Sequence, residues 1–331
     1  MRILIIKLGA IGDVIRSTSI LRGLREKHQT AEIDWITDSS ARDILINNPL
    51  INRLFTWEER GELKDYDLVI GLEDELPACE LASQLNPKKI LGAYAKDGKV
   101  LYTPSAWFDM SAISKFGLDK ANELKKNNRK SFQQHMAELL DIKVGPYLFD
   151  LTRDEIETGQ KYVKGLGISK QDKVVGMNTG AGQRWPLKAL NAEKTIELVN
   201  KIKNELGMAS LILGGAEEKA RNAVICKETG MPNAGLHPLR NFAAVINQCR
   251  LVVSSDSLAM HFAIALQKRT VAFFGPTSPF EIELYGLGAR VFPGLDCLIC
   301  YRQICDKDPN CMDVLAVKDL FKAVKREAER L

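Results

Sequence analysis

Short runs of apolar residues alternate along the chain with segments in which apolar residues recur every three or four positions. The first run, residues 3–8, indicates a buried strand, and a glycine-containing turn separates it from a helical pattern over residues 14–27. Strands of a parallel sheet are buried on both faces, so they read as continuous apolar runs. The pattern therefore predicts a βα unit at the start of the chain.

The alternation continues in two series. The first predicts strands at 33–37, 54–57, 68–72 and 89–91 and helices at 41–47 and 75–85. The second predicts strands at 173–178, 211–213, 251–254 and 270–274, a helix at 258–266 and a last helix from Val317. Between them, a lysine-rich stretch at 106–130 indicates loop and short helix, a helix ends near Leu140, and residues 145–170 are interpreted as a connector. Two α/β domains with Rossmann-like sheets are expected, residues 1–150 and 151–331.

Composition agrees with two domains and excludes some classes of protein. The chain has 331 residues, 45% of them hydrophobic, which is enough for two cores. Its 46 Lys and Arg residues against 42 Asp and Glu residues give a net charge of +4. That charge is too small to indicate nucleic-acid binding, but it suits an anionic substrate or membrane surface.

Hydropathy points to the cytoplasm. Four apolar residues precede Lys7, too few for a signal-peptide core, and no run approaches the roughly 18 apolar residues of a membrane span. We expect a cytoplasmic protein, attached at most to the inner face of the inner membrane.

The first predicted turn contains Gly9, Gly12 and Asp13. It lacks the glycine spacing of dinucleotide-binding and Walker phosphate loops, while its glycines admit a ligand close to the backbone. Asp13 follows the carboxyl end of a strand, where α/β sheets place functional groups. Two interpretations remain open: a helix N-cap, which makes a weak base, or a carboxylate that deprotonates an acceptor hydroxyl.

A second polar loop follows the strand at 173–178. Thr179, Gly180 and the neighbouring glycine amides can donate hydrogen bonds to phosphate oxygens, and Arg184 and Lys188 can neutralise a diphosphate. The alternative is that Trp185 is a packing residue and both cations are solvated.

Two further turns follow strands of the second series. Asp256 and Ser257 precede a helix that carries His261, and Gly275 and Thr277 lie in the next turn. A helix amino terminus favours an anion through its backbone donors and dipole. The alternative readings are capping for Asp256 and Ser257, and a buried structural imidazole for His261.

The chain has seven cysteines, and this odd number favours a reducing compartment. Four of them lie within fifteen residues: Cys297, Cys300, Cys305 and Cys311. A C-x2-C step often begins a tetrahedral thiolate site, so a structural zinc or iron ion is one interpretation. Free thiols or a disulfide are the others.

Taken in order, the motifs at Gly12-Asp13, Asn178-Thr179-Gly180 with Trp185-Pro186, Ser255-Asp256-Ser257 with His261, and Gly275-Pro276-Thr277 resemble glycosyltransferase family 9. This family comprises the ADP-heptose:lipopolysaccharide heptosyltransferases, and the resemblance spans nearly the whole chain. It implies the glycosyltransferase B fold, two Rossmann-like domains facing across a cleft.

The resemblance also implies roles. Asp13 would be the catalytic base, the loop from Thr179 to Arg184 would hold the donor diphosphate, Asp256 would bind the donor near its sugar, and Glu218 would face the ribose. The first domain would bind a lipid-linked saccharide acceptor of the lipopolysaccharide inner core and the second ADP-heptose, with inversion and no catalytic cofactor. The cysteine loop would be a structural clip. Apart from the resemblance, lysines at 115–130, with Arg129, are expected to contact a phosphorylated acceptor or the membrane.

This sequence departs from the family pattern at two positions. Gln183 stands where other members have a lysine, and Asp256-Ser257-Leu258 replaces Asp-Thr-Gly. Alternatives therefore remain: another nucleotide sugar with another glycan acceptor, a nicotinamide oxidoreductase, or a metal-binding module centred on the cysteines.

Overall fold

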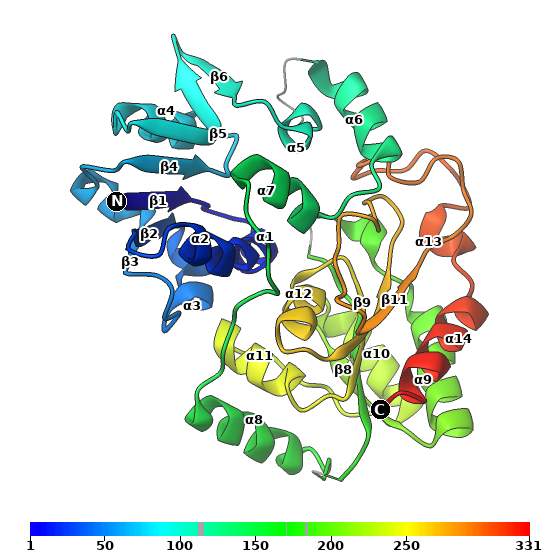
Figure 1. Ribbon diagram of the computed structural model, residues 1–331. Helices are drawn as coiled ribbons and strands as arrows, with labels where there is room; N and C mark the ends of the chain where they lie inside the picture. Colours follow the sequence, from blue (N-terminus) through cyan, green and yellow to red (C-terminus); the bar gives the residue numbers. More distant parts are fainter. Residues whose placement is uncertain (112–115, 170, 183–184) are drawn as a thin grey trace. The chain divides into compact units, whose positions relative to one another are not determined.

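The protein forms two compact units, each with its own sheet and helices (Figure 1). The structure is a computed structural model that describes residues 1–111, 116–169, 171–182 and 185–331. The first unit comprises Met1–Asp150 and Phe280–Glu283, and the second comprises Leu151–Pro279 and Leu284–Leu331. The α/β class predicted from the sequence is confirmed.

The first unit is built on a six-stranded sheet in the order β3-β2-β1-β4-β5-β6. Its strands are β1 (Arg2–Ile6), β2 (Glu32–Thr37), β3 (Arg53–Thr56), β4 (Leu68–Gly71), β5 (Lys89–Lys96) and β6 (Lys99–Tyr102). The first five are parallel, and β1, at the centre, is buried along Ile3–Ile6. β6 was not predicted; it pairs antiparallel with β5 around Asp97 and Gly98, both at positive φ. Asp-Gly between apolar residues is a hairpin signal.

The helix predicted at 14–27 is interrupted in the structure. It comprises α1 (Ile11–Ser17), the 3-10 turn η1 (Thr18–Ile20) and α2 (Leu21–Lys27). At the break, the hydroxyls of Ser17, Thr18 and Ser19 donate to backbone carbonyls three or four residues earlier, at 2.6–2.7 Å. Such bonds compete with the regular helical pattern and bend the helix.

The remaining elements of the first unit cover the sheet and its carboxyl edge. They are η2 (Ser39–Ala41), α3 (Arg42–Leu45), η3 (Trp57–Glu62), α4 (Leu76–Gln84), α5 (Ala106–Asp109), α6 (Gly117–Asn127) and α7 (Phe132–Leu140). The segment Phe280–Glu283 joins this unit through a backbone bond from Phe132 N to Glu281 O and through Arg129, which lies over the Phe280 ring.

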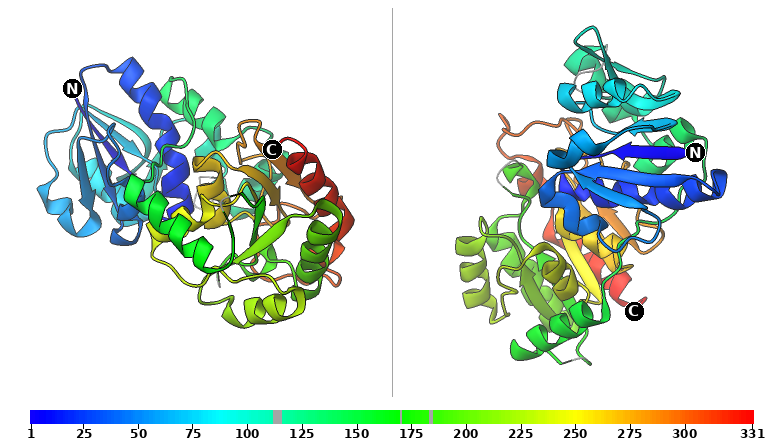
Figure 2. Two further views of the ribbon diagram at one scale, coloured as in Figure 1. Left: turned by 90° about the horizontal axis from the view of Figure 1, so that it is seen from below. Right: turned by 90° about the vertical axis from the view of Figure 1, so that its left-hand side faces the viewer.

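The second unit has a five-stranded parallel sheet in the order β11-β10-β9-β7-β8. Its strands are β7 (Val174–Asn178), β8 (Ala209–Leu213), β9 (Leu251–Ser255), β10 (Arg269–Phe273) and β11 (Gly288–Val291). Its helices are α8 (Arg153–Gly165), η4 (Pro186–Lys188), α9 (Ala192–Leu206), α10 (Lys219–Thr229), α11 (Leu239–Ile246), α12 (Leu258–Ala265), α13 (Cys311–Val314) and α14 (Val317–Ala328). The last helix, red in Figure 2, lies along β10 and β11.

The connector interpretation of residues 145–170 is wrong over half of its length, because α8 occupies thirteen residues of it. Thr152 and Glu155 form a capping box at its start, a signal that the sequence contains. Gly159 lets α8 approach α11 closely, since a Cβ there would lie 2.5 Å from Ala244 O.

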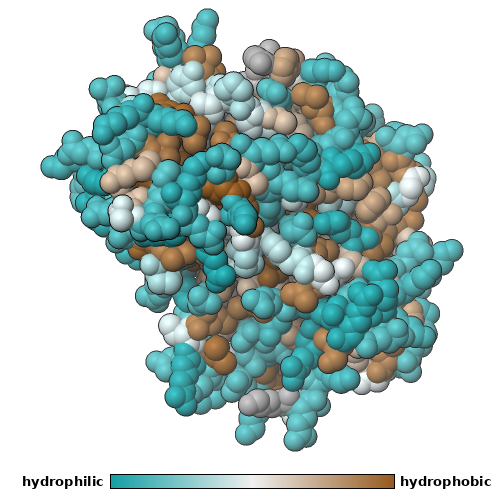
Figure 3. All heavy atoms as spheres, viewed as in Figure 1, coloured by the Kyte–Doolittle hydropathy of each residue, from teal (hydrophilic) through white to brown (hydrophobic). Residues whose placement is uncertain are grey.

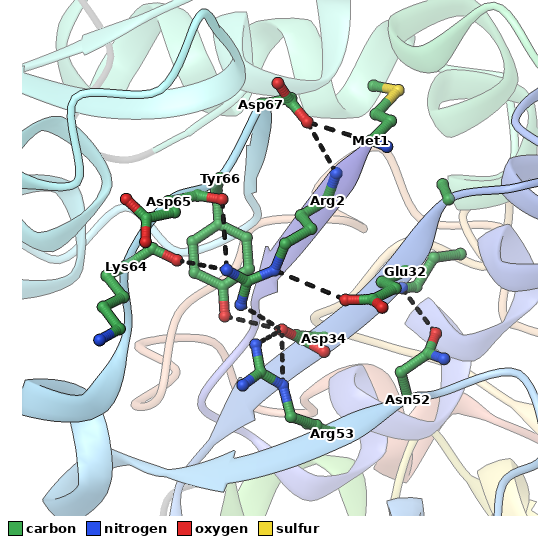
Figure 4. Close-up of polar contacts among 12 residues, drawn as sticks. Met1, Arg2, Glu32, Asp34, Asn52, Arg53, Lys64, Asp65, Tyr66 and Asp67 are labelled. Carbon is green, nitrogen blue, oxygen red and sulfur yellow. Dashed lines mark hydrogen bonds and ion pairs between the residues drawn. The ribbon is translucent and has the colours of Figure 1, made fainter.

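At the amino ends of the first three strands, a buried carboxylate gathers several donors (Figure 4). Asp34 of β2 is fully buried, and its Oδ2 accepts from Arg53 Nη2 at 2.6 Å and from the Tyr66 hydroxyl at 2.8 Å. Arg2 of β1 adds a weaker contact at 3.4 Å. A single carboxylate therefore ties three neighbouring strands together.

The surface carries mostly hydrophilic side chains on the face drawn in Figure 3, with apolar groups in separate places. Scattered apolar residues of this kind are normal for a folded protein. Over the ranges that the structure describes, no helix has the length and apolar character needed to cross a bilayer.

A partly buried ion pair joins α8 to α11. Glu155 accepts from Arg240 Nη2 at 2.9 Å and also from the backbone N–H of Thr152 at 2.7 Å. The bond from Arg240 holds the pKa of Glu155 down at about 2. Because the folded pKa lies below the ordinary value of 4.5, the pair stabilises the fold above that value and loses this contribution as the pH falls towards 2.

We expect Glu155→Gln to lower the free energy of unfolding by about 1–2 kcal/mol at pH 7, after allowance for solvent screening. The deficit relative to the parent should shrink between pH 5 and pH 3 in urea denaturation series. Glu157→Gln on the same helix removes an exposed partner of Arg153 and should cost less than about 0.5 kcal/mol. A deficit that does not depend on pH would contradict the assigned role of the charge.

Candidate functional site

The turn between β1 and α1 is organised by one carboxylate. Glu73, which follows β4, accepts from Lys7 Nζ at 2.7 Å and from the backbone N–H groups of Leu8 and Gly9 at 2.7 and 3.0 Å. Lys7 is buried, and the Glu73 side chain is only 13% exposed. Charge-assisted bonds of this kind are short and strong, so they set the path of the chain into α1. Glu73 was not among the predicted site residues.

Asp13 lies in the first turn of α1 and is not its N-cap, which is Ala10. The N-cap alternative is therefore wrong. Asp13 Oδ1 lies 2.9 Å from Arg16 Nη2, one turn further along, and the Asp13 side chain is 38% exposed. Gly12, expected in the turn, lies within α1. Gly9 does lie in the turn. A Cβ added there would lie 3.6 Å from Asp38 Oδ2, which is an ordinary contact distance.

Aromatic rings hold Arg16 in place. Its guanidinium lies 4.5 Å from the Phe132 ring centroid and 5.2 Å from that of Trp107, and the two rings meet edge to face at 5.1 Å. His135 packs against the other side of this group, 5.6 Å from Trp107. Cation–π contacts of this geometry stabilise the cation's position. No motif signals these residues, because they come from α5 and α7 and meet Arg16 only in the folded unit.

In the second unit, a cavity of about 410 Å³ lies at the carboxyl ends of β7 and β8. Its wall contains polar and apolar residues, namely Asn178, Gly180, Ala181, Gly182, Gly214, Gly215, Glu217, Glu218, Leu236, His237, Leu239, Phe242, Ser257, Leu258 and Ala259. Among the predicted site residues, Gly180, Glu218 and Ser257 line it. The apolar wall from Leu236 to Phe242 was not predicted, because it precedes and begins α11, far along the chain from the motifs.

Glu218 is fixed at the edge of this cavity. It is buried, and its Oε2 accepts from the Gly215 N–H at 2.7 Å. A Cβ at position 180 would lie 2.0 Å from Glu218 Cδ, so only glycine fits there with Glu218 in place.

Thr179 does not offer its hydroxyl to the cavity. The side chain is buried, and Oγ1 lies 2.5 Å from Asn222 Oδ1 and 3.2 Å from Leu213 O. The predicted hydroxyl contact with phosphate is therefore corrected: Thr179 bonds within the protein. Asn178 shapes the same loop, because its Nδ2 lies within 3.1 Å of Gly180 O and Ser257 Oγ.

Asp256 is paired with Lys188, lies near His261 and is not a helix cap. Lys188 Nζ lies 2.8 Å from Asp256 Oδ2, and His261 Nε2 lies 3.8 Å from Oδ1. Burial alone would raise the pKa of Asp256, but the charges of Lys188 and His261 bring it down to about 2. Lys188 is not merely solvated: it is largely buried and lies over the Trp185 ring. Ser257, the N-cap residue of α12, makes no side-chain cap bond.

The remaining predicted residues fall into three groups. Thr277 is buried beside this cluster and contributes to lowering the pKa of Asp256. Gly275 is explained by packing, since a Cβ there would lie 2.5 Å from Cys311 Sγ. Arg184 and Gln183 lie outside the described residues.

The cysteine loop was considered above as a possible metal site. All seven cysteines are free thiols, and no three His, Cys, Asp or Glu side chains of the described residues are arranged to hold a metal ion. The loop does bring thiols near one another: burial, then the neighbouring Cys300, Cys305 and Cys297, raise the pKa of Cys311 to about 11. Cys311, however, packs against Gly275 at the start of α13. The metal and disulfide alternatives are therefore not supported by these residues.

The pair of Lys188 and Asp256 makes a testable prediction. Lys188→Met leaves a largely buried carboxylate without its cation, so the free energy of unfolding should fall by about 2–4 kcal/mol at pH 7. The deficit should shrink on acidification, because protonation of Asp256 removes the unpaired charge.

A double-mutant cycle in urea with Asp256→Asn measures the coupling. The double variant should recover part of the loss that Lys188→Met causes. Additive effects of the two substitutions would show that the pair contributes nothing.

Comparison with known proteins identifies the family. The sequence model of glycosyltransferase family 9 (heptosyltransferase) matches residues 62–309. Lipopolysaccharide heptosyltransferase 1 of Campylobacter coli is 22% identical over 98% of both chains.

Solved structures share the fold. The family 9 glycosyl transferase of Veillonella parvula has a TM-score of 0.79 at 18% identity, covering 100% of this chain and 98% of that one. E. coli heptosyltransferase WaaC with ADP has a TM-score of 0.59 at 17% identity, covering 100% and 99%. The iron-containing glycosyltransferase TibC of enterotoxigenic E. coli has a TM-score of 0.61 at 13% identity, covering 99% and 76%. The family model covers more than half of the chain, and so this protein belongs to glycosyltransferase family 9, the heptosyltransferases.

Proposed function

We propose that this glycosyltransferase moves a heptose from ADP-heptose to a saccharide of the lipopolysaccharide inner core, with inversion at the anomeric carbon. The observation that carries the proposal is the cavity at the carboxyl ends of β7 and β8, which combines an apolar wall with a buried carboxylate. Such a combination suits a nucleoside, because the base needs apolar contact and the ribose needs a hydrogen-bond acceptor. A structure of the E. coli family member with ADP supports this choice of nucleotide.

Each part of the cavity has a proposed task. Leu239 and Phe242 contact the base, Glu218 accepts from a ribose hydroxyl, and the backbone amides of Gly180–Gly182 donate to the diphosphate. The ring of His237 adds a polar contact near the base; its Nε2 lies 2.6 Å from Ala234 O, so Nδ1 is the acceptor of the neutral ring.

The proposed mechanism divides the work between the two units. Asp13 takes the proton of the acceptor hydroxyl as that oxygen attacks the anomeric carbon, and the ADP departs. Arg184, Lys188 and the glycine amides stabilise the charge that develops on the departing diphosphate. His261 and Lys188 keep Asp256 ionised, so that it can orient the sugar hydroxyls. No step requires a metal ion.

The acceptor and the membrane are assigned to the first unit. α6 carries Lys120, Lys125 and Lys126, and exposed Phe116 and Leu118 lie at its start. Basic side chains beside apolar ones favour contact with an anionic lipid surface, to which each cation contributes about 1 kcal/mol. This supports a lipid-linked acceptor and peripheral contact with the inner membrane.

Asp13→Asn should reduce turnover by about 10² to 10⁴ while leaving the fold intact, because the amide cannot accept the proton. ADP release from ADP-heptose in the presence of acceptor measures this, and circular dichroism checks the fold. Asp43→Asn provides a matched control: Asp43 is an exposed acid in the first turn of α3, and turnover should be unchanged. A fully active Asp13→Asn enzyme would rule out the assigned base.

Gly180→Ala tests the nucleotide site. The new methyl group would displace Glu218, so the Kd for ADP should rise about tenfold or more, as expected for a lost bond to a charged group. Gly165→Ala is the control, since a Cβ there meets nothing within 4 Å.

Calorimetric titrations with ADP, GDP and UDP complete the test of the nucleotide. The parent enzyme should bind ADP most tightly. If the parent and Gly180→Ala bind ADP equally tightly, the nucleotide binds elsewhere. If the parent binds GDP or UDP more tightly than ADP, the donor is a GDP- or UDP-sugar and not ADP-heptose.

A further inference from the structure

A second and larger cavity lies at the opposite edge of the second sheet. It has a volume of about 960 Å³ and is lined by one face of α8 and by residues that precede β9 and β10, including Asn247, Gln248, Arg250 and Lys268. The nucleotide cavity lies at the carboxyl ends of the strands, whereas this one lies at the amino ends. β7, β9 and β10 each have five residues, so the two cavities are separated by about 15 Å along the sheet.

The lining of this distal cavity is strongly basic. Lys161 and Lys164 come from α8, and Arg250 and Lys268 come from the loops before β9 and β10. Glu157 is the only carboxylate among the lining residues, and it lies 3.2 Å from Arg153. Over the ranges that the structure describes, none of the four cations has a carboxylate within 4.0 Å. Burial lowers the pKa of Lys268, and nearby Arg250 adds to this effect.

The negative carboxyl ends of helices offset only part of this positive charge. α8, α11 and α12 all end at this edge of the sheet, and each carboxyl terminus is equivalent to about −0.5 charge. Three termini and Glu157 together offset about 2.5 of the four positive charges. A positive excess of about 1.5 charges remains without a partner, and an anion is its natural complement.

The backbone that carries the basic lining residues is held in place by other contacts. On α8, Glu157, Lys161 and Lys164 are spaced four and three residues apart and so share one face. Gly159 holds this helix close to α11. Backbone bonds from Arg250 N to Val174 O and from Lys268 N to Ala263 O, both 2.8 Å, fix the two loops. The basic side chains therefore project from anchored backbone, and the amides of Gln160, Asn247 and Gln248 supply neutral donors beside them.

We propose that this distal cavity binds a ligand that carries two or more phosphate groups, at a site separate from the nucleotide cavity. The Arg250 guanidinium suits bidentate contact with a phosphate, and the lysines neutralise the remaining charge. Its volume is more than twice that of the nucleotide cavity, which leaves room for a saccharide or headgroup attached to the phosphates. The proposal does not depend on the donor or acceptor of the transferase reaction.

The experiment compares the parent with Arg250→Gln/Lys268→Gln, which removes two charges from the distal cavity. Lys227→Gln/Lys322→Gln is the matched control, because it removes two charges from α10 and α14, outside the lining. Inorganic pyrophosphate is titrated in the presence of saturating ADP, and hydrogen exchange maps where amides become protected. We expect protection in residues 157–165 and 247–250, and a Kd at least tenfold weaker for Arg250→Gln/Lys268→Gln alone.

A second arm distinguishes a soluble phosphate ligand from a lipid headgroup. Vesicles of phosphatidylcholine with 30% phosphatidylinositol 4-phosphate, whose headgroup carries two phosphate groups, replace pyrophosphate, and pure phosphatidylcholine vesicles are the blank. Vesicle binding that the distal variant loses and the control keeps would identify a headgroup as the source of the phosphate. The proposal is overturned if neither probe protects these segments, or if the distal variant and the control bind both probes alike.

Discussion

Parallel strand pairing is the constraint on which the rest of the structure depends. β1 lies between β2 and β4, and β7 lies between β8 and β9, all in the same direction. Each strand must therefore be followed by a helix that returns to the starting edge. This separates the two edges of each sheet chemically: helix amino termini and polar turns gather at the carboxyl ends, and helix carboxyl termini gather at the amino ends. The candidate nucleotide cavity and the basic distal cavity occupy these two different environments.

Carboxylates that are fully or largely buried then fix the local geometry. Asp34, Glu73, Glu155 and Asp256 each accept from a cationic side chain, and Glu73 and Glu155 accept from backbone N–H groups as well. Removing a charge from water is costly unless its partners are well placed, so each pair tolerates little displacement. The turn before Asp13 and the cluster around Lys188 thus owe their shape to charges that lie beside the proposed reacting groups.

The sequence predicted what depends on local pattern. Strands buried on both faces, such as β1 and β9, were identified from their apolar runs, and the carboxyl-edge motifs followed from their position. β11, with four residues beginning at glycine, and β6 were too short or too polar to detect, and β5 was predicted only over its first three residues. Residues brought in from distant segments, such as Glu73, Trp107 and Phe242, carry no local signal, because only folding places them near the motifs.

The segment Phe280–Glu283 belongs to the first unit although the chain has by then passed through most of the second. Its backbone accepts a bond from Phe132, and Phe280 covers Arg129. During synthesis, the first unit therefore emerges from the ribosome lacking a piece of itself that arrives more than 100 residues later. The start of α7 can form its contact with this segment only after the segment has been synthesised. A protein cut at Asp150 would never receive it, so separate expression of the halves would yield an unfinished first half.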